Sequence, residues 1–167
     1  MRDPRLNKLA KILVGYSVAV KPGQLVRISG STVAQPLIAE IYREVILAGG
    51  NPSVFMTFDE EQEIKLKYAS DQQLQFLSPL AMFMVEKIDC SIGIWGGENT
   101  RALSNCDPKR QAMASAALKP FKDRFLERAA KNELHWVGTQ FPCPASAQDA
   151  EMSLAEYEEF VFGAGLL

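Results

Sequence analysis

The sequence is poor in the residues that most catalytic centres need. It contains a single histidine, His135, and three cysteines, Cys90, Cys106 and Cys143. The cysteines match no zinc-binding spacing, and a catalytic zinc needs two or three convergent histidine or carboxylate ligands. We therefore expect no metal site in this chain and a packed, structural His135. Unpaired thiols are typical of a reducing compartment, so we expect the protein in the cytoplasm.

Long apolar runs and an excess of one charge are also missing. No stretch of about 18 apolar residues occurs, which predicts no membrane-spanning helix. The charged first residues are not followed by the apolar segment of a signal peptide. Lysine and arginine number 18 against 20 acidic residues, giving a net charge of -2. This balance argues against nucleic acid or an anionic membrane as the main partner.

Motifs for nucleotide binding and nucleophilic catalysis are absent as well. Residues 29–32 (S-G-S-T) follow a predicted strand and open a predicted helix, but one glycine is far from a G-x-G-x-x-G or Walker loop. No G-x-S-x-G elbow occurs, and His135 is the only histidine that could serve a thiol as base. The acidic run at residues 59–63 suits the first turn of a helix, where it opposes the dipole; loose divalent-ion binding is the weaker alternative.

What the sequence does contain is a regular alternation of strands and helices. An amphipathic helix begins at Asp3 and Pro4, with apolar side chains at Leu6, Leu9, Ala10, Leu13 and Tyr16. Strands are predicted at residues 24–28, 52–57, 88–95 and 134–139. The segments between them have helical periodicity; one helix buries Ile38, Ile41, Tyr42 and Val45, another breaks near Pro120, and the last has Leu154, Tyr157, Phe160, Val161 and Ala164 on one face. Residues 29–32 and 140–147 are predicted as loops, and further helix starts are predicted at Ser70, Ser78, Asp107 and Ser153. The third strand is apolar almost throughout, which is typical of a strand buried on both faces.

This order predicts a three-layer α/β fold in a single domain, residues 1–167. Its mostly parallel sheet of about four or five strands is flanked by helices. Ligands of such sheets bind beyond the carboxyl ends of the strands. The polar residues expected there are Ser29, Ser31, Thr32, Thr57, Asp59, Glu98, Asn99, Thr100, Arg101, Thr139 and Gln140. Helix capping accounts for Thr32 and Asp59, whereas Arg101 has no evident structural role.

Several motifs carry a resemblance to a known family. They are D-P-R-L at residues 3–6, V-K-P-G-Q-L-V at 20–26, E-N-T-R at 98–101, W-V-G-T-Q-F-P at 136–142 and M-S-L-A-E-Y-E at 152–158. In this order they resemble the N-terminal half of the thermophilic metallo-aminopeptidases of the aminopeptidase T and aminopeptidase S type. Members of that family are longer and remove N-terminal amino acids from peptides. The apolar end at residues 163–167 is typical of a chain cut from a longer one.

The resemblance implies a parent enzyme with a two-metal site of the zinc, cobalt or manganese type, whose ligands lie in the C-terminal half. It supplies no catalytic residue and no metal ligand in this chain, which we expect to be inactive alone. The implied partners are the C-terminal catalytic domain of the same polypeptide, the peptide substrate and a second copy in a homodimer. The substrate-cleft candidates are Glu98, Asn99, Thr100, Arg101, Thr139 and Gln140. The alternatives are a non-catalytic α/β ligand-binding or interaction module, and a degenerate family member that lost its catalytic half.

Overall fold

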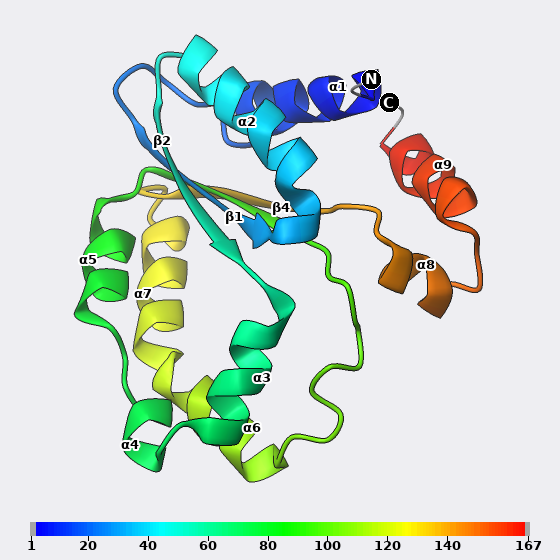
Figure 1. Ribbon diagram of the computed structural model, residues 1–167. Coiled ribbons are helices and arrows are strands. Elements are labelled where there is room, and N and C mark those ends of the chain that lie inside the picture. Colours follow the sequence, from blue (N-terminus) through cyan, green and yellow to red (C-terminus); the bar gives the residue numbers. More distant parts are fainter. Residues whose placement is uncertain (1–2, 166–167) are drawn as a thin grey trace.

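The protein is built on a parallel four-stranded sheet, seen in a computed structural model that describes residues 3–165. The strands lie in the order β2-β1-β3-β4, and every neighbouring pair is parallel (Figure 1). Their bounds are Leu25–Ser31 for β1, Asn51–Thr57 for β2, Cys90–Trp95 for β3 and His135–Gln140 for β4. The predicted α/β class and parallel sheet are confirmed.

Helices cover both faces of the sheet and extend beyond its carboxyl end. One face carries α1 and α2, the opposite face carries α5 and α7, and α3, α4 and α6 lie past the ends of the strands (Figure 1). This gives the three predicted layers. The helices are α1 (Pro4–Ile12), α2 (Gln35–Leu47), α3 (Asp59–Tyr68), α4 (Asp71–Leu74), α5 (Pro79–Lys87), α6 (Pro108–Ala117), α7 (Lys119–Ala130), α8 (Pro144–Asp149) and α9 (Leu154–Ala164), with a π turn at Leu13–Ser17 and a 3-10 turn at Thr32–Ala34. No described helix is long and apolar enough to cross a membrane.

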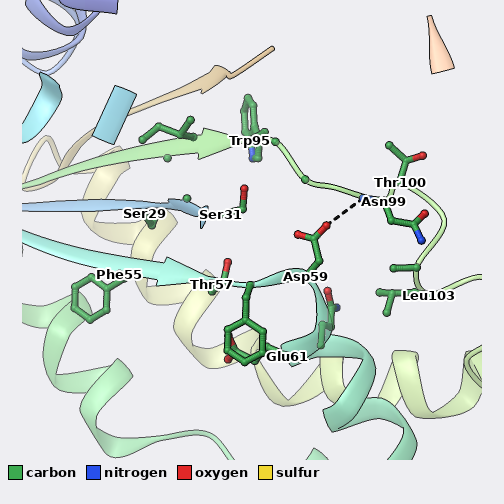
Figure 2. Close-up of a pocket in the computed structure, with 18 of the residues that line it drawn as sticks. Ser29, Ser31, Phe55, Thr57, Asp59, Glu61, Trp95, Asn99, Thr100 and Leu103 are labelled. Atoms are coloured by element: carbon green, nitrogen blue, oxygen red, sulfur yellow. Dashed lines mark hydrogen bonds between the residues drawn. The ribbon is translucent and has the colours of Figure 1, made fainter. Parts of the chain in front are cut away.

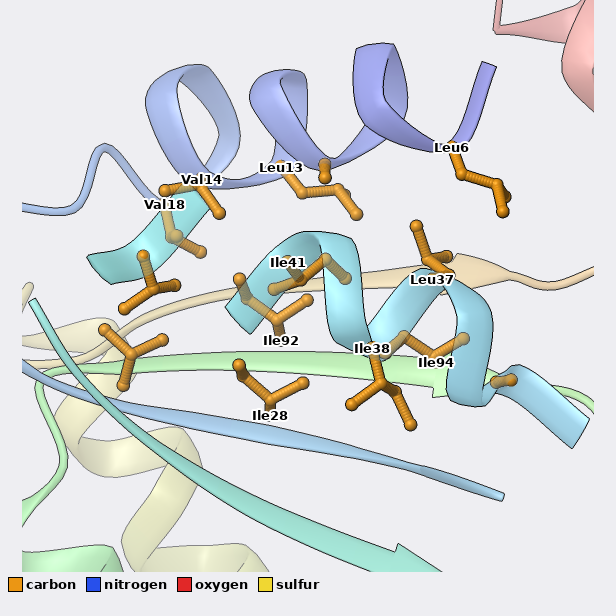
Figure 3. Packing of buried hydrophobic residues seen from close by; sticks show 14 of the residues in the cluster. Leu6, Leu13, Val14, Val18, Ile28, Leu37, Ile38, Ile41, Ile92 and Ile94 are labelled. Carbon is orange, nitrogen blue, oxygen red and sulfur yellow. The ribbon is translucent and has the colours of Figure 1, made fainter. Parts of the chain in front are cut away.

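The main core lies between the sheet and the α1/α2 layer. Alternate residues of β1 and β3, such as Ile28 and Ile92, pack against Ile38 and Ile41 of α2 (Figure 3). Ile28, Ile41 and Ile92 are fully buried. Each fully buried side chain of this kind stabilises the fold by about 1.5–3 kcal/mol. A second, small cluster beyond the strands joins Leu66, Leu74 and Cys106.

Most predicted helix starts are confirmed by capping hydrogen bonds. Asp3 accepts a hydrogen bond from the Arg5 backbone N–H at 2.9 Å. Ser70 and Ser153 each form a complete capping box with the residue three positions later. These bonds satisfy N–H groups that have no partner within the helix. The predicted break near Pro120 is also present, because α6 ends at Ala117 and α7 begins at Lys119.

Two side chains predicted to be buried are exposed instead. Tyr16 is 86% exposed because the first helix widens into the π turn, which brings Leu13 and Val14 onto the buried face. Tyr42 is 43% exposed at the edge of the α2 stripe formed by Ile41 and its buried neighbours.

The C-terminal part differs from the prediction in two ways. A short helix, α8, occupies residues 144–149, where a loop was predicted. In α9 the buried side chain is Phe162 rather than the predicted face, and Phe160 is 62% exposed. The reason is tertiary: Phe162 joins the main core and stacks against the Arg5 guanidinium at 4.5 Å. The apolar end at Leu166 and Leu167 lies outside the described residues.

Candidate functional site: a cavity at the carboxyl ends of the strands

A cavity of about 980 Å³ lies where the strands end, on the sheet face opposite α1 and α2. The sheet forms one wall, with Ser29, Ser31, Phe55 and Thr57 among its lining residues (Figure 2). Residues of α3, α6, α7 and α8 and of the loop after β3 also line it. The position is the one at which open parallel sheets bind ligands.

Strand alternation and small side chains create this space. Register pairs Ser29 with Phe55 on one side and Gly93 on the other, and Gly93 with Gly138, so these four residues share the cavity face. Serine and glycine leave room that larger side chains would fill. The Trp95 ring lies over Gly138, where an added Cβ would come 2.4 Å from the ring. The ring therefore depends on the absence of a side chain at Gly138.

Asp59 and Thr32 do not cap helices, contrary to the prediction. The Asp59 carboxylate accepts a hydrogen bond from the backbone N–H of Asn99 at 3.1 Å (Figure 2) and a second one from the backbone N–H of Glu98 at 2.5 Å. Helix α3 begins at Asp59 itself with no side-chain cap. Thr32 opens a 3-10 turn, also uncapped, because β1 continues through residues 29–31, which were predicted as a loop. Asp59 instead fixes the loop after β3 against the start of α3.

The structure gathers half of the predicted cleft candidates at the cavity. Asn99, Thr100 and Gln140 line it, and the Gln140 side chain donates to the Ser146 hydroxyl at 3.3 Å. Glu98, Arg101 and Thr139 do not line it. The Thr139 side chain lies on the opposite face of the sheet from the cavity. Thr139 pairs with Ile94, whose side chain belongs to the core on the α1/α2 face, and paired residues of neighbouring strands share a face. The last residue of β3, Trp95, is 61% exposed, so this strand is not covered on both faces along its whole length as predicted.

Arg27 is a charged cavity residue that the sequence did not identify as part of the site. Its Nη1 donates to the Ser91 hydroxyl at 3.2 Å, and its guanidinium lies 5.7 Å from the centre of the Phe55 ring. Its Nε is buried without a hydrogen-bond partner, and so is the hydroxyl of Ser31. Burial lowers the pKa of the Arg27 guanidinium from its ordinary value. An arginine at an inward position of a strand is the sequence signal that could have found it.

Thiol, histidine and metal chemistry find no support in the described residues. Cys90, Cys106 and Cys143 are free and buried, and burial raises the pKa of Cys90 to about 11. His135 is exposed rather than packed as predicted, because it begins the edge strand β4. Across residues 3–165, no three histidine, cysteine, aspartate or glutamate side chains converge in a way that could hold a metal ion.

Comparison with known proteins assigns the family. The family model for the thermophilic metalloproteases (M29) matches residues 2–167. The chain belongs to this family of metal-dependent peptidases, and the resemblance read from the sequence is confirmed. The described residues do not fit the divalent metal that this family implies, since they form no ligand cluster.

Solved structures also match the chain. Wild-type AmpT from Thermus thermophilus superposes with a TM-score of 0.79 at 18% identity, over 96% of this chain and 42% of that chain. This similarity shows the shared fold, and the chain spans less than half the length of AmpT. The CurK enoyl reductase, at a TM-score of 0.35 and 8% identity over 94% of this chain and 57% of that one, is too distant to inform the function. No curated protein sequence matches the chain.

Proposed function

We propose that this chain is the N-terminal domain of a longer, two-domain metal-dependent aminopeptidase that releases N-terminal amino acids from peptides. The observation that carries the proposal is the family match along the chain, combined with the lack of a metal-ligand cluster in the described residues. A metallopeptidase needs such a cluster for its chemistry. We therefore assign the metal ligands, for a two-metal site with zinc, cobalt or manganese, to a C-terminal catalytic domain of the same polypeptide.

In this proposal the cavity forms one wall of the substrate cleft. Asn99, Thr100 and Gln140 present polar groups at its edge, and Trp95 offers an exposed aromatic surface. The Asp59 carboxylate binds the backbone of the loop that carries Asn99 and Thr100, so the backbone from which these side chains project is fixed in position. Such positioning lowers the entropic cost of orienting a substrate. The cytoplasm and a homodimer of the longer protein belong to the same proposal; the free cysteines support a reducing compartment.

The test is an aminopeptidase assay with unblocked amino-acid amides in the presence of cobalt, zinc or manganese, run in parallel on this chain and on the full reading frame. We expect metal-dependent release by the longer protein and none by the 167-residue chain. N-acetylated substrates serve as the control, since an aminopeptidase requires the free amine. Metal-dependent release by this chain alone would contradict the assignment of all ligands to another domain, and inactivity of both proteins would contradict the aminopeptidase function.

A matched pair of variants in the longer protein tests the cleft wall. Gln140→Ala changes a residue that lines the cavity, whereas Thr139→Val changes its neighbour on the opposite sheet face. We expect the first to raise KM about tenfold, because a hydrogen bond to substrate contributes about 1 kcal/mol or somewhat more. We expect the second to leave KM unchanged. Equal effects of the two substitutions would show that this face does not contact the substrate.

A non-catalytic ligand-binding module is the second candidate function. It is favoured by one observation, the buried polar atoms of Arg27 and Ser31 that have no protein partner at the cavity. Protein interiors rarely leave such atoms unsatisfied, and a bound ligand is one way to satisfy them.

A further inference from the structure

The cavity contains a positive charge that the protein itself does not neutralise. Arg27 donates one hydrogen bond, to the neutral Ser91 hydroxyl, and no carboxylate of residues 3–165 forms an ion pair with it. By contrast, the half-buried Arg110 and the buried Arg128 each have a carboxylate within 3.5 Å, from Asp71 and Glu133. Removing a charge from water without a partner is unfavourable, so an uncompensated arginine facing a cavity indicates an anionic ligand.

The unused edge of the Arg27 guanidinium is the one suited to a carboxylate. Nη1 is occupied by Ser91, whereas Nε and Nη2 make no hydrogen bond within residues 3–165. In this same protein, Nε and Nη2 of Arg124 bind the two oxygens of Glu86 at 2.7 and 2.8 Å. Of the two free atoms of Arg27 only Nε is fully covered, so an entering carboxylate meets Nη2 first.

A second polar group without a partner, the Ser31 hydroxyl, lies farther along β1. Ser31 is 8% exposed, lines the cavity, and has a hydroxyl without a hydrogen-bond partner. Its Cα lies about 13 Å from that of Arg27, since a strand rises about 3.3 Å per residue. Between them lie the Ser29 hydroxyl and the Phe55 ring of the neighbouring strand. The two polar groups therefore belong to separate points along the strand, and an extended molecule suits such an arrangement.

The overall charge of the cavity suits a ligand with one negative charge. Arg27, Lys65 and Lys122 line it together with the carboxylates of Asp59 and Glu61. Asp59 is already bound to two backbone N–H groups of the loop after β3. The lining therefore has three positively charged side chains and two carboxylates, and one of these carboxylates, Asp59, already accepts hydrogen bonds from the protein backbone. The aromatic side chains in the wall favour an apolar body over a highly charged one such as a phosphate.

We propose that this cavity binds an extended organic carboxylate, with the carboxylate at Arg27 and Ser29, an apolar body against Phe55, and a hydrogen-bonding group at Ser31. A short peptide with a free carboxyl terminus and a linear organic acid both have this chemistry. The site binds its ligand without metal, so the inference stands independently of the aminopeptidase function.

The experiment is a calorimetric titration of the chain, without added metal, with four probes: the tripeptide Gly-Gly-Leu, its C-terminal amide, 4-phenylbutyrate and inorganic phosphate. We expect the tripeptide to bind and its amide to bind at least about tenfold more weakly, because the charge-assisted bonds to Arg27 are lost. Tighter binding of the tripeptide than of 4-phenylbutyrate identifies a peptide ligand, and the reverse identifies a free acid. Equal affinity for tripeptide and amide, tighter binding of phosphate, or no carboxylate binding would overturn the proposal.

Variants locate the binding to this cavity. Arg27→Met removes the charge at similar length and should weaken tripeptide binding at least about tenfold. Ser31→Ala removes the partnerless hydroxyl and should weaken it about fivefold without loss of folding, because that hydroxyl makes no bond in the free protein. Lys109→Met makes the same charge change at an exposed position outside the cavity and should have no effect. Unchanged affinity in both cavity variants, with thermal unfolding confirming that they fold, would place the ligand elsewhere.

Discussion

Substitution of Arg128 tests how the helices α5 and α7 are held on the sheet face opposite α1 and α2. This buried side chain of α7 donates to the backbone carbonyls of Val85 at 2.7 Å, Ile88 at 2.8 Å and Glu133 at 3.0 Å. The first two carbonyls lie at the end of α5, where helices leave oxygens without internal partners. One guanidinium therefore joins the end of α5 to the turn before β4.

The substitution Arg128→Met keeps most of the side-chain volume and removes the donors. Each buried carbonyl that loses its partner costs about 1–3 kcal/mol, and the whole change should lower the free energy of unfolding by about 3–5 kcal/mol. That is a large part of the 5–15 kcal/mol typical of a domain. Arg124, one turn earlier on the same helix, is the matched control. Its ion pairs with Glu86 and Glu127 lie at the surface, where water screens them, so Arg124→Met should have a much smaller effect.

Urea denaturation followed by circular dichroism measures both variants against the wild type. We expect the midpoint of Arg128→Met to fall far below that of Arg124→Met, with a similar slope for all three proteins. Arg128→Lys should recover only part of the loss, since an ammonium group cannot match the spread of the three carbonyls. If the two methionine variants were equally stable, the bonds of Arg128 would not hold the layer together, and the reasoning would be refuted.

Three further predictions concern the cavity and the core. Asp59→Asn removes the negative charge from the side chain whose Oδ2 accepts hydrogen bonds from both loop amides. Both bonds lose their charge assistance, so hydrogen exchange measured by NMR should accelerate at those amides; unchanged protection would exclude the proposed role of Asp59. Gly138→Ala places a Cβ against the Trp95 ring and should destabilise the protein by about 1–3 kcal/mol and change its tryptophan fluorescence, whereas Trp95→Ala should remove the penalty. Burial raises the pKa of Cys90 from its ordinary value of 9.0 to about 11, so the unfolded thiol releases its proton first and stability falls as pH rises from 9 to 11. In Cys90→Ala, denaturation curves across that range should show a shallower fall.

The sequence was sufficient for the elements and their class. Periodicity located the four strands to within about three residues, and capping residues such as Ser70, Ser153 and Asp107 marked helix starts, because a cap acts within a few residues of itself. The parallel sheet followed from the alternation of strands and helices, since parallel neighbours need a crossover between them. The same alternation predicted the region of the cavity, because the loops at the carboxyl ends of parallel strands gather on one edge.

The tertiary structure alone decided which side chains meet in that region. Whether Thr139 or Gln140 faces the cavity depends on the register of β4 relative to β3. A shift of this register by one residue would exchange the faces on which the two side chains lie. Asp59 looked like a helix cap because its true partners, two amides far along the chain, are brought near only by folding. Arg27 looked like an ordinary strand residue because the absence of a counter-ion depends on everything packed around it. Local structure depends on neighbours in sequence, whereas this site depends on neighbours in space.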